Sequence, residues 1–146
     1  MKKTKWSSLI RIPLLLALAL AFVPSHAEIA IIANPGNSLH GISMKEIRDI
    51  YLGKSRSFSN GERVNAVDQP ASSEIRKAFS KNVLNMSVRE FNRYISKRKF
   101  SGKVRAPKVI DGDIAVRQWV ANTPSGLGYI NGKSVNSSVK VLLIIP

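Results

Sequence analysis

The sequence contains no cysteine, which excludes disulfide bonds, thiolate metal ligands and a cysteine nucleophile. It contains only two histidines, His26 and His40, and His26 falls in a segment that we expect to be removed. One remaining histidine provides too few ligands for a zinc site, and the G-x-S-x-G pattern of serine hydrolases does not occur. We therefore predict no metal site, no cofactor and no enzymatic activity.

Acidic residues are also scarce, because nine Asp and Glu stand against 23 Lys and Arg, for a formal net charge of +14. Four of the cations precede residue 28, whereas all nine acids lie at or beyond it, so residues 28–146 keep a formal charge of +10. This excess points to an anionic partner, such as a small anion, an acidic protein or a negatively charged envelope surface. The alternative is a basic, well-solvated surface with no specific partner. Nucleic acid is not expected, because the very basic residues 97–108 hold one aromatic side chain, Phe100, for base stacking.

Long apolar runs are absent apart from one near the start, IPLLLALALAFV at residues 12–23. The run follows a basic segment and precedes the small residues Ser25 and Ala27, which is typical of a secretory signal peptide. It is too short to span a bilayer comfortably, although an uncleaved anchor is the alternative. We expect residues 1–27 to be removed after Ala27, leaving a soluble, exported single domain of residues 28–146.

The first half of this domain predicts a strand followed by a helix. Residues 28–33 are almost continuously apolar, which is typical of a buried strand. Ser43 and Glu46 match a capping box, and Gly53 is suited to end the helix that they begin. The core face of this helix is predicted to consist of Ile47, Ile50 and Tyr51.

The middle of the domain predicts a polar loop or hairpin, a second strand and two helices. Asn60-Gly61 indicates a tight turn before a strand at residues 63–68. A helix follows from Ser72 or Ser73 to about residue 83, and a further capping box begins the next helix. The side chains expected on these helices are Ile75, Ala78, Phe79 and Val83 on the first, with Ser87 and Glu90 as the box and Phe91, Tyr94 and Ile95 as the core face of the second.

The last third begins with a segment at residues 96–108 that is predicted to be a basic connector. Asp111 or Asp113 is then expected to cap a fourth helix, and two strands follow near residues 126–130 and 139–145. The resulting order β-α-β-α-α-α-β-β favours an α/β fold in which helices cover a small mixed sheet. The cations of the connector are Lys97, Arg98, Lys99, Lys103, Arg105 and Lys108.

The junction between the second strand and the second helix is the most informative candidate site. The strand ends at Asp68, and the first turn of the helix follows Ser72 and Ser73. Such a turn has unpaired N–H groups and a partial positive potential, so anions bind there readily. Serine hydroxyls can donate hydrogen bonds to an oxyanion, and Arg76 is placed to add charge. The alternative is that serine caps the helix and no ligand binds.

Two longer stretches resemble a known family. The sequence SMKEIRDIYLGKSRSFSNGERVNAVDQPASSEIRKAF, at residues 43–79, resembles the part of phosphate-type periplasmic binding proteins that leads to the start of the ligand-binding helix. NTPSGLGYI, at residues 122–130, resembles a turn and strand of that family, and the NPGNS loop at residues 34–38 fits the same order. The resemblance covers most of residues 28–143. It implies a type II periplasmic-binding-protein-like fold with an anion held at a helix N-terminus.

The resemblance also implies which residues hold the anion. Ser73 and Phe79 match the serine and phenylalanine of the family's ligand-binding helix, whereas Glu74 and Ile75 replace its glycine and threonine. The arginine that usually precedes this run is missing. The predicted anion-binding residues are Ser72, Ser73, Arg76 and Gln69, with Ser38 and Ser125 approaching from neighbouring loops.

The size of the predicted domain matches about one lobe of such a two-lobed protein. The resemblance implies a periplasmic solute-binding-like protein that binds an oxyanion, with inorganic phosphate as the first candidate, for uptake or sensing. An ABC transporter permease or a membrane sensor is the expected protein partner. The alternative is an interaction module that binds no small ligand and docks on an envelope sensor or transporter through the basic face at residues 97–108.

Overall fold

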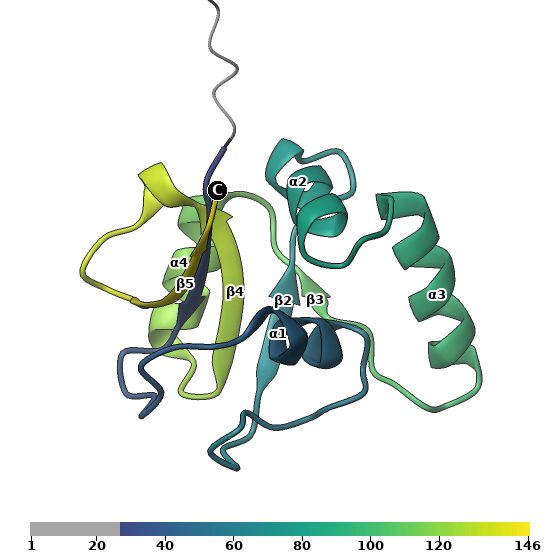
Figure 1. The fold of residues 1–146 in the computed structure, drawn as a ribbon, viewed down its shortest axis with the longest axis horizontal. Coiled ribbons are helices and arrows are strands. Elements are labelled where there is room, and N and C mark those ends of the chain that lie inside the picture. The colour runs from purple at the N-terminus through teal and green to yellow at the C-terminus, as the bar shows by residue number, and fades with distance from the viewer. Residues whose placement is uncertain (1–26) are drawn as a thin grey trace, which may run out of the picture.

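The computed structural model describes residues 27–146, so the predicted signal segment lies outside the described residues except for Ala27. The described chain folds into a mixed sheet covered by helices (Figure 1), as the sequence predicts. The sheet has five strands, and helices lie on both of its faces. Among these residues, no helix combines the length and the apolar character that crossing a membrane requires. The strands are β1 (Ile29–Ala33), β2 (Asn65–Asp68), β3 (Lys108–Val109), β4 (Gly126–Asn131) and β5 (Lys140–Ile145). The helices are α1 (Met44–Tyr51), α2 (Glu74–Asn82), α3 (Val88–Phe100) and α4 (Asp113–Asn122), with a 3-10 turn η1 (Gly132–Ser134).

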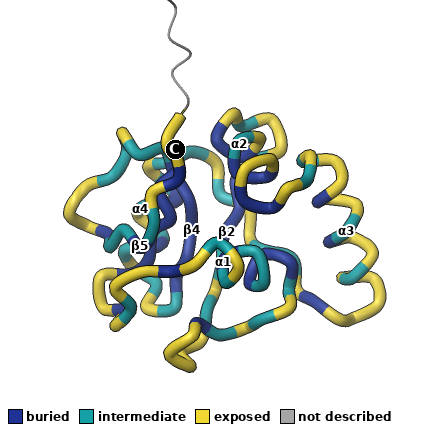
Figure 2. The backbone as a smooth tube through the Cα atoms, viewed as in Figure 1, coloured by how far each residue is buried: buried dark blue, intermediate teal, exposed yellow. Residues whose placement is uncertain are grey.

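The sheet has the strand order β3-β2-β4-β1-β5. β2 pairs in parallel with β3 and β4, whereas β1 runs antiparallel to both of its neighbours, β4 and β5. Every residue of β1 is buried, and its alternate side chains enter two separate cores. This burial explains why the strand reads as a continuous apolar run. The neighbouring strand β4 is also buried over most of its length (Figure 2). Because β2 runs parallel to β3 and to β4, the carboxyl ends of these three strands lie at the same end of the sheet.

The two faces of the sheet are covered by different helices. α1, α2 and α3 supply buried residues to the core that contains Ile29 and Ile31, whereas α4 supplies them to the core that contains Ala30 and Ile32. On the first face, the ring of Phe79 stacks on that of Tyr129 with centroids 3.9 Å apart. The predicted apolar faces of the first three helices are confirmed as buried or partly buried.

Serine N-caps begin α1, α2 and α3, as predicted, but only one capping box is complete. The Ser87 hydroxyl accepts a hydrogen bond from Glu90 N, and the Glu90 carboxylate accepts one from Ser87 N. At α1 the prediction of a full box is wrong, because the Glu46 carboxylate accepts instead from Ser59 N, at 2.7 Å. Glu46 thereby ties the hairpin that contains Ser59 to α1.

The predicted basic connector is partly helical, which corrects the boundary at residue 96. Lys97, Arg98 and Lys99 lie in the last turn of α3, which ends at Phe100. Cations are favourable at a helix C-terminus, and no glycine or proline interrupts the segment before Gly102. The short strand β3, which pairs with β2, was not predicted.

The prediction that an aspartate caps α4 is also wrong. The N-cap is Gly112, which has no side chain to make the bond. The Asp113 carboxylate instead accepts hydrogen bonds from three groups beyond its own helix. Asp113 therefore fastens the start of α4 to the end of β2 and to the segment after β4. Its donors are Gln69 Nε2 at 2.9 Å, Asn131 N at 3.1 Å and Ser134 Oγ at 2.8 Å.

Candidate anion-binding site

The turn between β2 and α2 presents two serines at an accessible helix start. Ser73 is the N-cap, and its hydroxyl oxygen lies 3.4 Å from Arg76 N, a long hydrogen bond. Ser72 is exposed and Ser73 is partly exposed. Within residues 27–146, the N–H groups of Glu74 and Ile75 have no acceptor among the backbone and side-chain hydrogen bonds. The first turn of α2 therefore keeps donors that no described protein group uses.

Arg76 lies in the protein interior and does not point into the solvent. Its side chain is 2% exposed, and its Nε lies 2.8 Å from Asp68 Oδ1, in an ion pair that is not aligned as a hydrogen bond. Nη1 donates to Ser80 Oγ at 2.6 Å, and Nη2 donates to Asn92 Oδ1 at 3.2 Å. The guanidinium also lies over the ring of Phe91, 4.7 Å from its centroid. The charge of Arg76 is thus directed at the protein's own carboxylate.

Asp68 acts as an internal anion at the end of β2. Its Oδ1 accepts hydrogen bonds from the Tyr129 hydroxyl and, at 2.8 Å, from Gln69 N. Burial raises the pKa of the Asp68 carboxyl, while the Arg76 guanidinium and these two donors oppose the rise. Burial and the nearby Asp68 also raise the pKa of the Tyr129 hydroxyl. The polar groups at this strand end therefore bond to one another.

Gln69 is committed in the same network. Its side-chain Nε2 donates to Asp113 Oδ1 at 2.9 Å and to the Tyr129 carbonyl at 3.0 Å, and the residue is buried. Gln69 is close to the start of α2 in the sequence, but the N–H groups of its side-chain amide already donate to protein acceptors. Its role in the described structure is to connect β2, β4 and α4.

Ser38 and Ser125 lie at the opposite edge of the sheet. The Ser125 carbonyl accepts from Asn65 N at 2.8 Å, beside the first residue of β2. The Ser38 hydroxyl donates to Glu62 Oε1 at 2.8 Å, in the hairpin that precedes β2. Gln69 is four positions after Asn65, which corresponds to about 13 Å of extended chain. The structure therefore brings Ser72 and Ser73 together at α2 and does not bring Ser38 or Ser125 to them.

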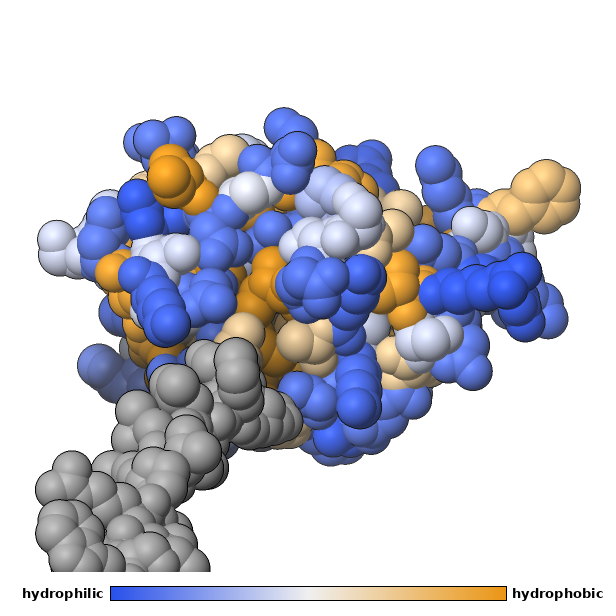
Figure 3. Space-filling view, turned by 90° about the horizontal axis from the view of Figure 1, so that it is seen from above, coloured by the Kyte–Doolittle hydropathy of each residue, from blue (hydrophilic) through white to orange (hydrophobic). Residues whose placement is uncertain are grey.

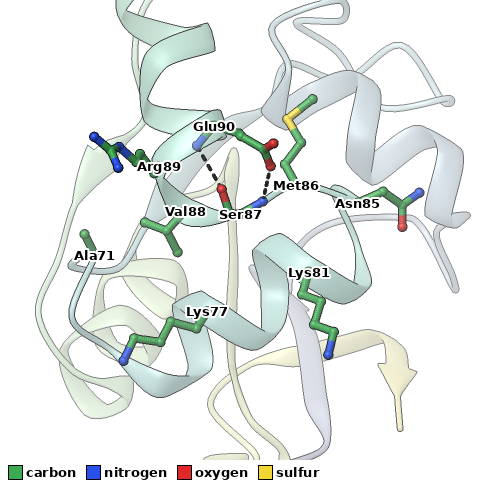
Figure 4. A pocket seen from close by; sticks show the side chains of 9 residues that line it. All are labelled: Ala71, Lys77, Lys81, Asn85, Met86, Ser87, Val88, Arg89 and Glu90. Carbon is green, nitrogen blue, oxygen red and sulfur yellow. Dashed lines mark hydrogen bonds between the residues drawn. The ribbon is translucent and has the colours of Figure 1, made fainter.

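A groove of about 650 Å³ runs beside the α2 start, between α2 and the beginning of α3 (Figure 4). Lys77 and Lys81 project from α2 and Arg89 from α3, with Val88 between Lys77 and Arg89. Lys77 forms an exposed ion pair with Glu74, at 2.7 Å. These cations were not among the predicted anion-binding residues, although the i, i+4 spacing of Lys77 and Lys81 indicates that they share a helix face. The lining residues are Ala71, Lys77, Lys81, Asn85, Met86, Ser87, Val88, Arg89 and Glu90.

The face that includes this end of the molecule is mainly hydrophilic, with apolar side chains in small areas between the polar ones (Figure 3). His40 lies exposed in the loop before α1. Over the described part of the chain, no three His, Cys, Asp or Glu side chains are grouped so as to hold a metal ion. What the α2 start offers is hydrogen-bond donors and nearby cations, which is the chemistry of anion binding.

A scan against models of known protein families finds no match, and a search of curated proteins finds none either. Among solved structures, the fold is similar to that of a Clostridium perfringens protein described as a phosphate ABC transporter substrate-binding protein, solved with bound phosphate. The TM-score is 0.63 at 21% identity, over 80% of this chain and 45% of that one.

Two further structures show the same similarity. An ABC-type phosphate transport receptor from Vibrio cholerae matches with a TM-score of 0.63 at 19% identity, over 80% of this chain and 46% of that one. PstS from Borrelia burgdorferi matches with a TM-score of 0.59 at 15% identity, over 80% and 47%. This chain thus spans less than half the length of these neighbours. The similarity shows that the chain has a periplasmic-binding-protein-like fold of about one lobe.

Proposed function

We propose that this protein is a solute-binding-like domain that binds a small oxyanion, inorganic phosphate first, at the start of α2. The observation that carries the proposal is the accessible first turn of α2, where the Ser72 hydroxyl and the N–H groups of Glu74 and Ile75 have no partner among the described protein groups. The Ser73 hydroxyl accepts from Arg76 N and keeps its own O–H to donate. The similarity in fold to a protein solved with bound phosphate supports phosphate as the first ligand to test.

The donors of the proposed site are the hydroxyls of Ser72 and Ser73 and the N–H groups of Glu74 and Ile75. These groups belong to one helical turn, so their dipoles add at the ligand. Lys77, Lys81 and Arg89 border the adjacent groove and contribute positive potential. Arg76 contributes indirectly, because its ion pair with Asp68 fixes the first turn of α2 to the end of β2.

The proposal includes a cellular setting. The signal peptide expected at residues 1–27 would export the chain to the periplasm. Two of the structural neighbours are described as a phosphate ABC transporter substrate-binding protein and an ABC-type phosphate transport receptor. A transporter permease or a membrane sensor is the proposed protein partner. The serines at the α2 start are exposed or partly exposed in the described chain, so we expect weaker phosphate binding there than at a site enclosed by two lobes.

Calorimetric titration of the protein with phosphate and with sulfate tests the site. We expect measurable heat at millimolar phosphate and a loss of about tenfold in affinity for Ser73→Ala, since a hydrogen bond to a charged group contributes about 1.5 kcal/mol. Ser43→Ala is the matched control, because Ser43 caps α1 and also accepts from the third N–H of its helix. Equal affinity of the two variants for phosphate, or no heat from the parent protein, would overturn the proposed function.

A further inference from the structure

Helix α3 lies at one end of the molecule, and only one of its sides is covered (Figure 1). The covered side packs against α2, and Phe91 and Ile95 on this side are buried in the core. Beside them, the Tyr94 hydroxyl donates to the Leu52 carbonyl at 3.0 Å and ties α3 to the end of α1. Exposed residues follow one another on the other side of the helix (Figure 2). α3 is therefore fixed in orientation, with one side facing away from the protein.

The exposed side of α3 carries a row of cations that ends in an aromatic ring. Arg93, Lys97 and Phe100 are exposed and follow one another at spacings of four and three residues. Residues at these spacings lie above one another on a helix, here over about 10 Å along its axis. In the part of the chain that the structure describes, neither cation forms an ion pair, and the sequence has no acidic residue from 91 to 110. The row therefore has a positive charge that no carboxylate of this segment neutralises.

Phe100 is the most exposed large apolar side chain among the described residues. It is 96% exposed, whereas Ile114, the next in order, is 61% exposed. The end of α3 around it is well defined, because the N–H groups of Gly102 and Lys103 each donate at 3.0 Å to a carbonyl of the last helical turn. These two bonds form a Schellman motif, and Gly102 has the left-handed φ of +72° that the motif requires. The ring is therefore held outside the protein by a regular helix end.

We propose that the outer α3 surface, formed by Arg93, Ser96, Lys97 and Phe100, binds the surface of a bilayer that contains anionic phospholipids. The headgroups of such a bilayer attract cations that lie within a Debye length of them. Phenylalanine beside these cations inserts at the boundary between headgroups and acyl chains. A single projecting ring needs a matching pocket on a protein partner, whereas a bilayer accepts it without one. Charge and exposure together therefore favour a lipid surface over an acidic protein.

This surface is separate from the proposed phosphate site. None of its four residues lines the groove beside the α2 start. Vesicle binding and phosphate binding can therefore be measured independently, and loss of one does not predict loss of the other.

Co-sedimentation with lipid vesicles tests the cations of the outer α3 surface. The exported protein is expected to bind vesicles of phosphatidylcholine and phosphatidylglycerol at least about tenfold more strongly than vesicles of phosphatidylcholine alone. Arg93→Gln/Lys97→Gln should weaken binding to the anionic vesicles by about tenfold or more, because each cation near such a surface contributes about fivefold. All proteins compared have the same N-terminus, so any apolar residues retained there contribute equally.

The matched control for these cations is Arg63→Gln/Lys133→Gln. It removes one arginine and one lysine, both exposed, from the hairpin before β2 and from η1, so its net charge equals that of the α3 double variant. We expect it to change binding to the anionic vesicles by less than about twofold, because these cations lie outside the proposed surface. Equal losses in the two double variants would show that only the net charge of the protein matters, and would overturn the proposal.

The ring is tested by a variant that leaves the charge unchanged. Phe100→Ala is expected to weaken binding to the anionic vesicles by about fivefold or more, since the exposed ring no longer enters the lipid. Ile114→Ala removes an exposed apolar side chain from α4 and should leave vesicle binding unaltered. Equal binding by Phe100→Ala and the parent protein would rule out insertion of the ring.

A probe at the surface itself covers the case in which a variant does not fold. The sequence has no cysteine, so Ser96→Cys gives a single attachment point for a polarity-sensitive dye on the outer α3 surface. Ser137→Cys places the same dye between η1 and β5, at the other end of the molecule from α3 (Figure 1). We expect the emission of the dye to shift to the blue with anionic vesicles at residue 96 and not at residue 137. An equal shift at both positions, or no preference of the parent protein for anionic vesicles, overturns the proposal, the latter in favour of an acidic protein partner.

Discussion

Arg76 is the residue at which the structure departs most from what its position in the sequence indicates. It follows Ile75 and precedes Phe79 by three residues, so it lies on the buried side of α2 with them. A charge in the core is tolerated there because Asp68 lies against it and because Ser80 and the Phe91 ring complete its surroundings. The pair is therefore a structural element of the α2 start rather than an exposed ligand contact.

Removing the cation of this pair is expected to destabilise the fold in a pH-dependent way. Arg76→Met leaves a buried carboxylate unpaired, at a cost of about 3–5 kcal/mol in the free energy of unfolding near pH 7. The pKa of Asp68 is already above its ordinary value of 3.8, and loss of Arg76 raises this pKa further. A carboxyl whose pKa is raised in the folded state stabilises the fold fully at a pH below 3.8. This stabilisation is lost as the pH rises through the pKa of the folded state.

The difference in the free energy of unfolding between the parent protein and Arg76→Met should therefore grow as the pH rises from 4 to 8. Urea unfolding followed by circular dichroism at several pH values measures it. Lys81→Met is the matched control, since Lys81 is an exposed cation on the same helix and its loss should change stability by at most about 0.5 kcal/mol at any pH. A difference that shrinks with rising pH would contradict the prediction.

Glu74 is the carboxylate nearest to the proposed phosphate donors, since it is the first residue of α2. It stabilises the positive end of the helix, but it also repels an anion that approaches the same turn. We expect Glu74→Gln to tighten phosphate binding by about two- to fivefold at low ionic strength, which corresponds to about 0.5–1 kcal/mol of screened repulsion. Calorimetry measures the change, and Asp49→Asn on α1 removes the same charge as a control. Weaker phosphate binding by Glu74→Gln would argue against a ligand at this turn.

At the scale of elements, helices fixed by contacts between residues close in sequence were predicted. Features that depend on contacts between distant segments, such as strand pairing, were not. The caps Ser73 and Ser87 and the apolar spacing after them were sufficient to predict α2 and α3, because these interactions lie within about one helical turn. β3 has two residues, and only its pairing with β2 makes it a strand. Aspartate is a common N-cap residue, but the Asp113 carboxylate accepts hydrogen bonds from Gln69 and from the end of β4 instead.

The end of α1 depends on a glycine that also meets the connector after α3. Gly53 has a φ of +72°, and a Cβ built on it would lie 2.3 Å from Val104 Cγ1. Gly53→Ala therefore adds a steric clash with a core residue to the cost of a left-handed conformation, which is about 1 kcal/mol. We expect it to lower the free energy of unfolding by about 2 kcal/mol or more.

Gly61→Ala provides the comparison for this prediction, because Gly61 has a φ of +85° but nothing within 4 Å of a Cβ. Both alanine variants adopt an unfavourable backbone conformation, and only Gly53→Ala meets another side chain. Thermal and urea unfolding of the two should therefore show the larger loss at Gly53. Equal losses of stability in the two variants would mean that the segment around Val104 moves away from the new methyl group with no loss of free energy.

At the scale of the whole molecule, the strand order decides which predicted site residues meet. Ser72 and Ser73 are neighbours in sequence, so their placement at the α2 start could be predicted. Ser38 and Ser125 were expected to join them, but the loop after β1 and the turn before β4 lie at the amino ends of β2 and β4. That arrangement follows from β1 running antiparallel to β4, and no local pattern in the sequence specifies it.

The buried strand β1, which lies between β4 and β5, also makes the two faces of the sheet a single folding unit. β1 contributes Ile29 and Ile31 to one core and Ala30 and Ile32 to the other, so neither core can form fully without it. We therefore predict that both cores are lost in one cooperative transition, as in most single domains of this size. The two cores carry different optical probes, which makes the prediction testable.

A chain of residues 28–146 has Trp119 as its only tryptophan, and this residue packs on the core beneath α4. Tyr51 and Tyr129 lie in the other core, together with Phe79. Tryptophan fluorescence and near-ultraviolet circular dichroism, recorded during the same urea titration, should give coincident midpoints because β1 couples the two faces. Separate midpoints, with the fluorescence change first, would show that α4 unfolds from its face while the core under α1, α2 and α3 persists.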